Sequence, residues 1–392
     1  MLGGAYADEL KDKWTVKGSI PNPVAGSVVV ELYGEVYVIG GSNGSVSTNE
    51  VQVYDLAKGT WSTKKSMPTA RAGAAYAVVN NKIYVFGGYT GNYYTFTGGT
   101  VVDNVEVYDP VADTWEIKKH MPLKLMTPGA SDYNGKIYLF GGLEAGVNSV
   151  SNVQEYNPIT DTWVSKNDMK QIIHSPATIT YKNKIYLIGG RKGSSSTFNT
   201  LKVYDPETDT WETKANMNFA RGGGVGAAIL EGKIYAIGGV SPTAETNTVE
   251  AYDPLTNTWE IKPNLNDARF GTSAVTYKGQ IFVIGGSSKT ASNTTVGSVE
   301  VYPEKPNSSE PDTATPGNRA ILVVTMDTGL EKEFDLSMEE VNAFISWYEN
   351  KQSGSGSASY AINKHDNNKG PFSSRKDYMI FNKILTYQVS EY

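Results

Sequence analysis

Cysteine is absent from the 392 residues of this chain, which excludes disulfide bonds, thiolate metal ligands and a cysteine nucleophile. No apolar run approaches the ~18 residues that a membrane-spanning helix needs. Only three histidines are present, and no two of them have the spacing of metal ligands. The formal net charge is -6 with both signs dispersed, so no basic nucleic-acid-binding surface is indicated. We therefore expect no cofactor, no metal ion, no nucleic-acid partner and no transmembrane segment.

A unit of about 50 residues repeats six times before Pro303. The clearest copy covers residues 183–211 and consists of NKIYLIGG, a polar loop and LKVYDPETDTW. Successive Gly-Gly doublets end 47, 54, 48, 49 and 47 residues apart, and each closes an alternating apolar run. Such alternation of β-branched and aromatic residues predicts half-buried strands. A second run in each copy carries a tyrosine, followed seven residues later in the first five copies by a tryptophan: Trp61, Trp115, Trp163, Trp211 and Trp259.

The Gly-Gly doublet, the spaced Tyr and Trp and the period resemble the kelch repeat. The resemblance covers roughly residues 12–303. It implies an all-β fold, a six-bladed kelch β-propeller with four antiparallel strands in each blade around a central channel. The repeated aromatic residues are then expected to pack between neighbouring blades, because one blade alone cannot bury both of its faces.

The two ends of the repeat region complement each other. The segment KDKWTVKGSIP places Trp14 where GTWSTKKSMP places Trp61. The sixth copy is interrupted by Pro303 and has Ser309 where the other copies have tryptophan. We therefore expect a strand from the N-terminus to complete the sixth blade and close the ring.

The innermost strand of each blade is expected to follow a Met-Pro-like step. The six predicted strands are Val24 to Leu32, Arg71 to Val79, Pro128 to Tyr133, Ser175 to Tyr181, Gly222 to Leu230 and Phe270 to Tyr277. Asn-rich and Gly-rich turns lead from each of them into the Gly-Gly strand, as β-hairpins require.

The connections between the second and third strands vary in sequence, and variable loops on a rigid scaffold are the usual place for binding. We call them the rim loops; they comprise residues 42–50, 89–104, 143–152, 191–200, 240–248 and 287–298. The second loop is the longest and carries Tyr89, Tyr93, Tyr94 and Phe96, which we expect to contact a sugar or a protein partner.

Three arginines occupy one equivalent position at the entry to the innermost strands: Arg71, Arg221 and Arg269. The resemblance to ligand-binding kelch propellers implies that such arginines ring the channel mouth, where they would suit a carboxylate or an acidic peptide. The alternative is a structural role in tying adjacent blades together. His174 falls one residue after the equivalent position of its blade and is a further candidate contact for the ligand. We expect no catalytic residue, because nothing in the sequence supplies a partnered acid and base.

Residues 304–318 form a Pro-, Ser- and Thr-rich run that predicts a linker. The domains are thus expected at 1–303 for the propeller and 319–392 for a small α+β (ββαββ-like) domain. In that domain Ser337 and Glu340 form a capping box, and an i, i+3, i+4, i+7 apolar stripe from Val341 to Tyr348 predicts an amphipathic helix.

The leading functional hypothesis is a non-catalytic module that recognises a glycan or a partner protein through the rim loops. One alternative is a sugar-acid isomerase resembling bacterial six-bladed kelch sialic-acid mutarotases. Another is an adhesin or phage-tail component whose C-terminal domain docks to an assembly. The resemblance excludes a galactose-oxidase-like enzyme, whose cross-linked tyrosine requires cysteine. An Ala-Tyr-Ala before Asp8 and the Ser/Thr/Asn-rich composition favour an extracellular or cell-surface location, with a cytoplasmic one as the alternative.

Overall fold

The computed structural model describes residues 12–145, 148–193, 196–242, 244–288 and 294–303. It also describes parts of the C-terminal region: 319–326, 331–337, 340–341, 343–345, 347–348, 359–364, 375–380 and 384–391. The chain divides into two compact units, Met1–Pro306 and Asn307–Tyr392. The predicted linker at 304–318 lies outside the described residues.

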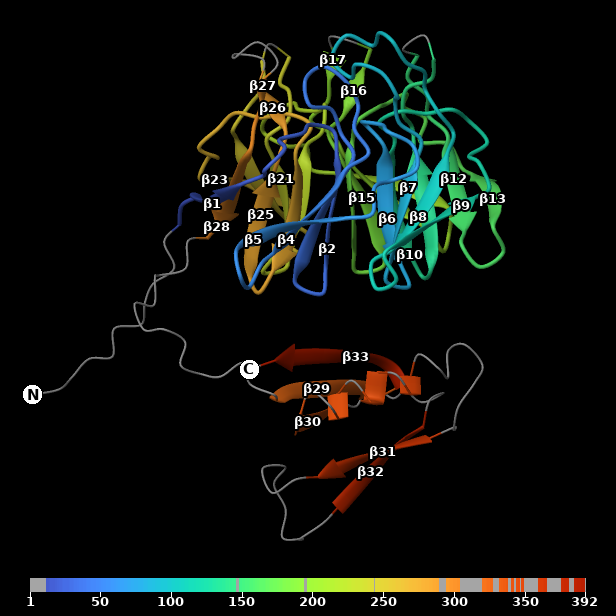
Figure 1. The fold of residues 1–392 in the computed structure, drawn as a ribbon, viewed down its shortest axis with the longest axis vertical. Helices are drawn as coiled ribbons and strands as arrows, with labels where there is room; N and C mark the ends of the chain where they lie inside the picture. Colours follow the sequence, from blue (N-terminus) through green and yellow to red (C-terminus); the bar gives the residue numbers. More distant parts are fainter. Residues whose placement is uncertain are drawn as a thin grey trace, which may run out of the picture. The chain divides into compact units, whose positions relative to one another are not determined.

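Six four-stranded antiparallel sheets form the first unit, and each sheet is one blade of a propeller (Figure 1). The first three blades consist of β2 (Val28–Leu32), β3 (Glu35–Ile39), β4 (Val51–Asp55) and β5 (Thr60–Lys64); β6 (Ala75–Val79), β7 (Lys82–Phe86), β8 (Val105–Asp109) and β9 (Thr114–Lys118); and β10 (Gly129–Tyr133), β11 (Lys136–Phe140), β12 (Val153–Asn157) and β13 (Thr162–Lys166). The fourth and fifth consist of β14 (Ala177–Tyr181), β15 (Lys184–Ile188), β18 (Leu201–Asp205) and β19 (Thr210–Lys214); and β20 (Gly226–Leu230), β21 (Lys233–Ile237), β22 (Val249–Asp253) and β23 (Thr258–Lys262). The sixth has the order β1 (Thr15–Ser19), β28 (Ser298–Tyr302), β25 (Gln280–Ile284) and β24 (Ser273–Tyr277).

Two short ribbons extend from the rim loops. They are β16 (Arg191–Lys192) with β17 (Ser196–Thr197), and β26 (Ser287–Ser288) with β27 (Thr294–Thr295). Figure 1 shows both on the same face of the propeller, so the rim loops share one face as the repeat predicts.

The Gly-Gly doublets allow adjacent blades to approach closely. In the fourth blade Gly189 has φ +60°, and a Cβ added there would lie 2.2 Å from the carbonyl oxygen of Arg221, at the entry to the fifth blade. The next residue, Gly190, donates its N–H to that same oxygen at 2.9 Å. A side chain at Gly189 would therefore push apart two blades that the backbone holds together.

The repeated Tyr and Trp form one stacked or tilted pair in every blade, as expected. Their ring centroids are 4.7–5.2 Å apart in the six pairs. The indole N–H also reaches the preceding blade: Trp115 donates to the carbonyl of Lys65 at 2.8 Å and Trp259 to that of Ala215 at 2.8 Å. The pair thus fills the space between blades and links them by a hydrogen bond.

The sixth blade is closed by the N-terminal strand, as predicted. β1 pairs with β28, with Thr15 opposite Val301. Trp14 is buried against Tyr302 and donates its indole N–H to the carbonyl of Pro263 at 2.9 Å. Tyr302 donates its hydroxyl to Asp12, as Tyr108 does to Asp113 within the second blade. The N-terminal segment therefore supplies the outer strand of the sixth blade with the same Trp and Asp contacts, although a register shift between Val16 and Gly18 interrupts its pairing with β28.

The innermost strands begin later than the sequence predicts. Residues at or next to the predicted starts instead form isolated bridges to the rim loops, such as Ala72 with Tyr89 and His174 with Arg191. One residue with positive φ follows the bridge in five blades, for example Gly73 at +61° and Ser175 at +50°, and two follow it in the fifth, Gly223 and Gly224. This left-handed conformation breaks the extended chain, and the regular strand starts only after it.

The described residues of the second unit form a three-stranded sheet, β30 (Glu331–Ser337), β29 (Arg319–Met326) and β33 (Ile384–Glu391), and a hairpin, β31 (Ser359–Lys364) with β32 (Arg375–Ile380). Residues 340–341, 343–345 and 347–348 are helical. Val341 and Phe344 of the predicted stripe are fully buried among strand residues, together with Trp347, which the stripe omits. The C-terminal part of the chain forms two strands, β32 and β33, which belong to different sheets. The order of elements is therefore ββαβββ and not the predicted ββαββ.

Candidate functional site

The six innermost strands surround a central channel that contains a cavity of about 640 Å³. Its lining comes from every blade, since β2, β6, β10, β14, β20 and β24 each contribute consecutive residues. This volume lies within the ~300–1,000 Å³ that is usual for small-molecule sites. The channel is therefore large enough to hold a ligand.

A ring of backbone hydrogen bonds frames the channel at its rim end. Each bond joins the positive-φ residue of one blade to that of the next. Five such bonds, of 2.6–3.0 Å, run from Ser175 to Thr127, Thr127 to Gly73, Gly73 to Gly26, Gly26 to Gly271 and Gly271 to Gly223. The fifth blade has one extra residue in its Gly222–Gly224 segment, and the ring is open there among the bonds of the described chain. Because backbone bonds hold this frame, the channel mouth is rigid at five of its six junctions.

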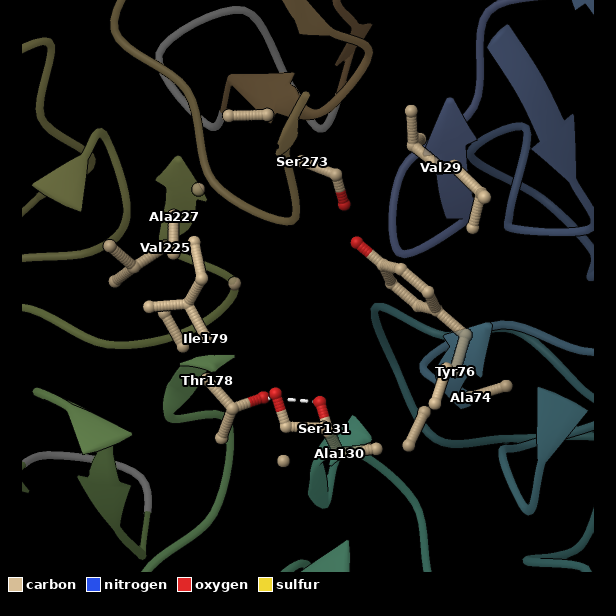
Figure 2. Close-up of a pocket in the computed structure, with 18 of the residues that line it drawn as sticks. Val29, Ala74, Tyr76, Ala130, Ser131, Thr178, Ile179, Val225, Ala227 and Ser273 are labelled. Carbon is tan, nitrogen blue, oxygen red and sulfur yellow. Dashed lines mark hydrogen bonds between the residues drawn. The ribbon is translucent and has the colours of Figure 1, made fainter. Parts of the chain in front are cut away.

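Polar groups lie at two levels of the channel wall. The second positions of the innermost strands include Tyr76 and Thr178, and Figure 2 shows the Tyr76 hydroxyl directed across the channel toward Ser273. Burial raises the pKa of Tyr76, and a hydrogen bond with Ser273 lowers it by less. The fourth positions include Glu31 of β2 and Asp132 of β10, the only charged residues in the lining.

Burial raises the pKa of both channel carboxyls. For Glu31 the hydrogen bond from Gly34 N, at 2.8 Å, opposes this effect, and for Asp132 a hydrogen bond from its own backbone does so. The side chain of Asp132 is nevertheless exposed, because the channel is open to solvent at this level. The sequence analysis missed Tyr76, Glu31 and Asp132. The available signal was the alternating register of the innermost strands, which places second and fourth positions on one face.

The long rim loop closes the channel at the other end. The Tyr93 ring rests against the α-carbons of Gly26 and Gly73, where an added Cβ would lie 3.1 and 2.7 Å from ring atoms. Burial raises the pKa of Tyr93 to about 12. Tyr94 makes an edge-to-face contact with Phe270 of the sixth blade, at 6.2 Å between centroids. Tyr93 and Tyr94 therefore pack over the channel mouth, and each keeps part of its surface accessible.

Of the four aromatic residues predicted for this loop, Phe96 is the exposed one. Tyr89 is buried with Val101, Met126 and Leu143, and its ring meets Phe96 edge to face at 5.8 Å. Phe96 keeps 43% of its surface accessible. The loop thus presents one large apolar side chain to solvent from a packed base.

The three arginines lie away from both the channel and the rim surface. Their side chains are completely buried and paired with glutamates of the third strand in the same blade. Arg221 is bonded to Glu250 at 2.6 Å and to the carbonyl of Thr248 at 2.7 Å. Burial lowers the pKa of Arg221, and Glu250 raises it by less. This differs from the expected ligand contact at Arg71, Arg221 and Arg269 and matches the structural alternative.

A correlation between blades identifies this structural role. The three blades with arginine have glutamate two residues before the repeated tyrosine of the third strand: Glu106, Glu250 and Glu300. The blades with Val24, Leu125 and Ile173 at the arginine position have instead Gln52, Gln154 and Lys202. Because glutamate occurs at this position only in the three blades that carry the arginine, the sequence already contained the pairing.

His174 is buried at the entry to the fourth blade, with 6% of its surface exposed. Its Nδ1 lies 3.0 Å from Ser175 Oγ and its Nε2 3.1 Å from the carbonyl oxygen of Gly193. Burial lowers its pKa to about 4; the Gly193 carbonyl raises it, and the nearby Arg191 lowers it further. His174 is thus a neutral packing residue at physiological pH.

Within the described ranges no group of three or more His, Cys, Asp or Glu side chains could hold a metal ion. Nor does any helix among the described residues have the length and apolarity to cross a membrane. The candidate sites are therefore the channel and the exposed part of the rim loops.

The six blades, the glycine doublets and the Tyr–Trp pairs define a kelch-repeat β-propeller. Two family models match the chain: the Attractin/LZTR1 beta-propeller over residues 118–304 and the KLHDC2/KLHL20/DRC7 Kelch-repeats domain over residues 8–167. Between them they span all six blades and the closing strand.

Two individual proteins are similar to this chain. An uncharacterized protein of Clostridium acetobutylicum is 36% identical over 81 residues, which are 21% of this chain and 20% of the relative. The match thus spans about a fifth of the length of that curated relative. The solved structure of YjhT superposes with a TM-score of 0.62 at 17% identity, over 72% of this chain and 95% of YjhT. At this identity the likeness to YjhT concerns the fold alone.

Proposed function

We propose that this protein is a non-catalytic recognition module that binds a glycan or a partner protein through its rim loops. The observation that carries the proposal is a pair of exposed apolar side chains, Val46 and Phe96, on two loops that are bonded together. Val46 is 55% exposed. Ser47 Oγ lies within hydrogen-bond distance of the carbonyl oxygens of Tyr89 (2.9 Å) and Gly91 (2.7 Å), and Asn92 Nδ2 reaches that of Gly44 at 3.5 Å. We call Val46 and Phe96 the rim platform.

A platform held by a packed loop base loses little conformational entropy when a ligand binds. An aromatic ring such as Phe96 can stack on the apolar face of a sugar or anchor a protein contact. The packing of Tyr93 and Tyr94 over the channel mouth supports the loop that carries Phe96. The two apolar side chains of the platform therefore suit recognition, and they do not supply an acid-base pair for catalysis.

The test is a glycan array probed with the full chain, with the Val46→Ser/Phe96→Ser variant and with Ile117→Ser as the control. Ile117 lies on the outer strand β9 and is 63% exposed, so the control removes a similar apolar side chain far from the rim. Binding that the platform variant loses and the control retains supports the proposal. Equal binding by all three proteins contradicts the site. A purified protein partner, once known, would be tested with the same three proteins.

Two alternatives remain open to experiment. A sugar-acid mutarotase would accelerate sialic-acid anomer exchange, which NMR measures directly, and acceleration would displace the proposal. An adhesin or phage-particle component would use the C-terminal unit for docking, so deletion of residues 319–392 would abolish assembly while rim binding persists. An extracellular or cell-surface location suits the recognition module and is tested by cell fractionation.

A further inference from the structure

We propose that the central channel is a second binding site, separate from the rim platform, for a linear organic cation with several N–H donors, such as a diamine or polyamine. Its volume of about 640 Å³ suits a small molecule. The lining determines which chemistry can occupy it.

Three threonine hydroxyls of the wall keep acceptor capacity toward the channel. Thr178 donates its hydroxyl proton to the carbonyl of Ala130 at 2.6 Å, and Thr180 donates to that of Asp132 at 2.6 Å. Thr276 donates in the same way to the carbonyl of Ile229 at 2.8 Å. Each bond joins the innermost strands of two neighbouring blades. Because a hydroxyl has one proton and two lone pairs, what these threonines retain for a ligand is acceptor capacity.

The charge of the lining has one sign. Glu31 and Asp132 are its only charged residues, and Lys, Arg and His do not occur among the residues that line it. Both occupy the fourth position of their strands, so they lie at one level of the channel wall, in the first and third blades. Glu31 accepts a bond from Gly34 N through one oxygen, and a carboxylate has further acceptor sites. A cation at this level would be attracted by both carboxylates, which an anionic or neutral ligand would not be.

The ring of Tyr76 adds a third favourable element. It lies in the channel between Val29 of the first blade and Ala130 of the third (Figure 2). An aromatic face attracts an ammonium group and packs against a methylene chain. A ligand of alternating methylene and amine groups therefore matches acceptors, carboxylates and ring together.

The Tyr93 ring packs over the rim end of this channel against Gly26 and Gly73, whereas Asp132 is exposed toward the other end. A cation would therefore enter from the face opposite the rim loops. Binding in the channel and binding at the rim platform should then be independent of each other.

The test is isothermal titration calorimetry of the full chain with cadaverine and spermidine. The matched ligands 1,5-pentanediol and glutarate have the same carbon chain as cadaverine with neutral and anionic ends. The test variant is Glu31→Gln/Asp132→Asn. The control is Glu116→Gln/Glu212→Gln, which removes two exposed carboxylates from outer strands and changes the net charge equally. Thermal melts of each variant verify that it is folded.

We expect the amines to bind the wild type and the control with similar affinity. The channel variant should bind them at least about tenfold more weakly, which corresponds to the loss of one charged contact. Three results would overturn the inference: no amine binding at millimolar concentration, equal weakening in both variants, or pentanediol or glutarate binding as well as cadaverine. If the channel variant is unfolded, the single variant Asp132→Asn, at an exposed side chain, provides the same comparison. The rim platform variant should leave amine binding unchanged, so failure of either proposal is distinguishable from failure of the other.

Discussion

Trp14 and Tyr302 stack with their ring centroids 5.1 Å apart and their planes at 30°, although they come from opposite ends of the propeller. The same pairing occurs within single blades elsewhere, as between Tyr204 and Trp211 at 4.8 Å. The contact that joins the two ends of the ring is therefore of the same kind as the contacts that build each blade.

The first prediction concerns this closure. Trp14→Ala should lower the free energy of unfolding by roughly 3–5 kcal/mol, because it leaves a cavity and removes the bond to Pro263. Val16→Ala on the same strand is the control, since Val16 is mostly exposed and should cost well under ~1 kcal/mol. Urea unfolding measures both, and equal losses would mean that β1 does not hold the ring closed.

The second prediction concerns the buried ion pairs. Arg221→Met should destabilise the fold by about 3–5 kcal/mol, because Glu250 would stay buried without its cation. Lys214→Met, which breaks the exposed pair with Glu212, should cost less than about 1 kcal/mol. Thermal unfolding distinguishes the two variants. If both lose the same amount of stability, the structural role assigned to Arg221 is wrong.

The third prediction concerns pH. His174 has a folded pKa of about 4 against an ordinary value of 6.5. Between these values the unfolded chain binds a proton that the folded chain does not, so stability must fall as the pH is lowered from 6.5 toward 4. The total effect is about 3 kcal/mol. His174→Gln should remove this part of the pH dependence, as unfolding at pH values across the window would reveal. A variant with the wild-type slope would show that another group is responsible.

The fourth prediction compares two glycines with left-handed backbones. Gly189→Ala and Gly135→Ala both incur the strain of positive φ, about 1–2 kcal/mol. At Gly135 an added Cβ meets nothing within 4 Å, whereas at Gly189 it meets the Arg221 carbonyl at 2.2 Å. Gly189→Ala should therefore lower the free energy of unfolding by several kcal/mol more than Gly135→Ala, because its Cβ pushes the fourth and fifth blades apart. Similar melting temperatures for the two variants would contradict the close approach.

The sequence predicts the scaffold well because the scaffold repeats. Six copies of a glycine doublet and a Tyr–Trp spacing leave few alternatives to six blades, and Trp14 with the interrupted sixth copy indicates how the ring closes. The direction in which a side chain points cannot be predicted from the repeat in the same way. Position in the repeat places Arg221 near the channel mouth, but in the structure its guanidinium lies inside the blade, paired with Glu250.

The residues of the candidate sites are also difficult to predict from the sequence, because their roles depend on how the blades are arranged. Tyr93 looks like an exposed loop residue in sequence, and only the glycines at 26 and 73 leave space for its ring over the channel. Glu31 and Asp132 lie in strands with no shared motif, so their common level becomes evident only when the blades are arranged around the axis.

The strand that closes the propeller also fixes the order of events during synthesis. Asp12 and its partner Tyr302 are 290 residues apart, so the ribosome releases the first half of this contact long before the second. Until β28 emerges, β1 has no strand to pair with, and the first and sixth blades present open faces. Because unpaired strand edges promote association between chains, the nascent protein is most exposed to misassembly just before its last blade is complete.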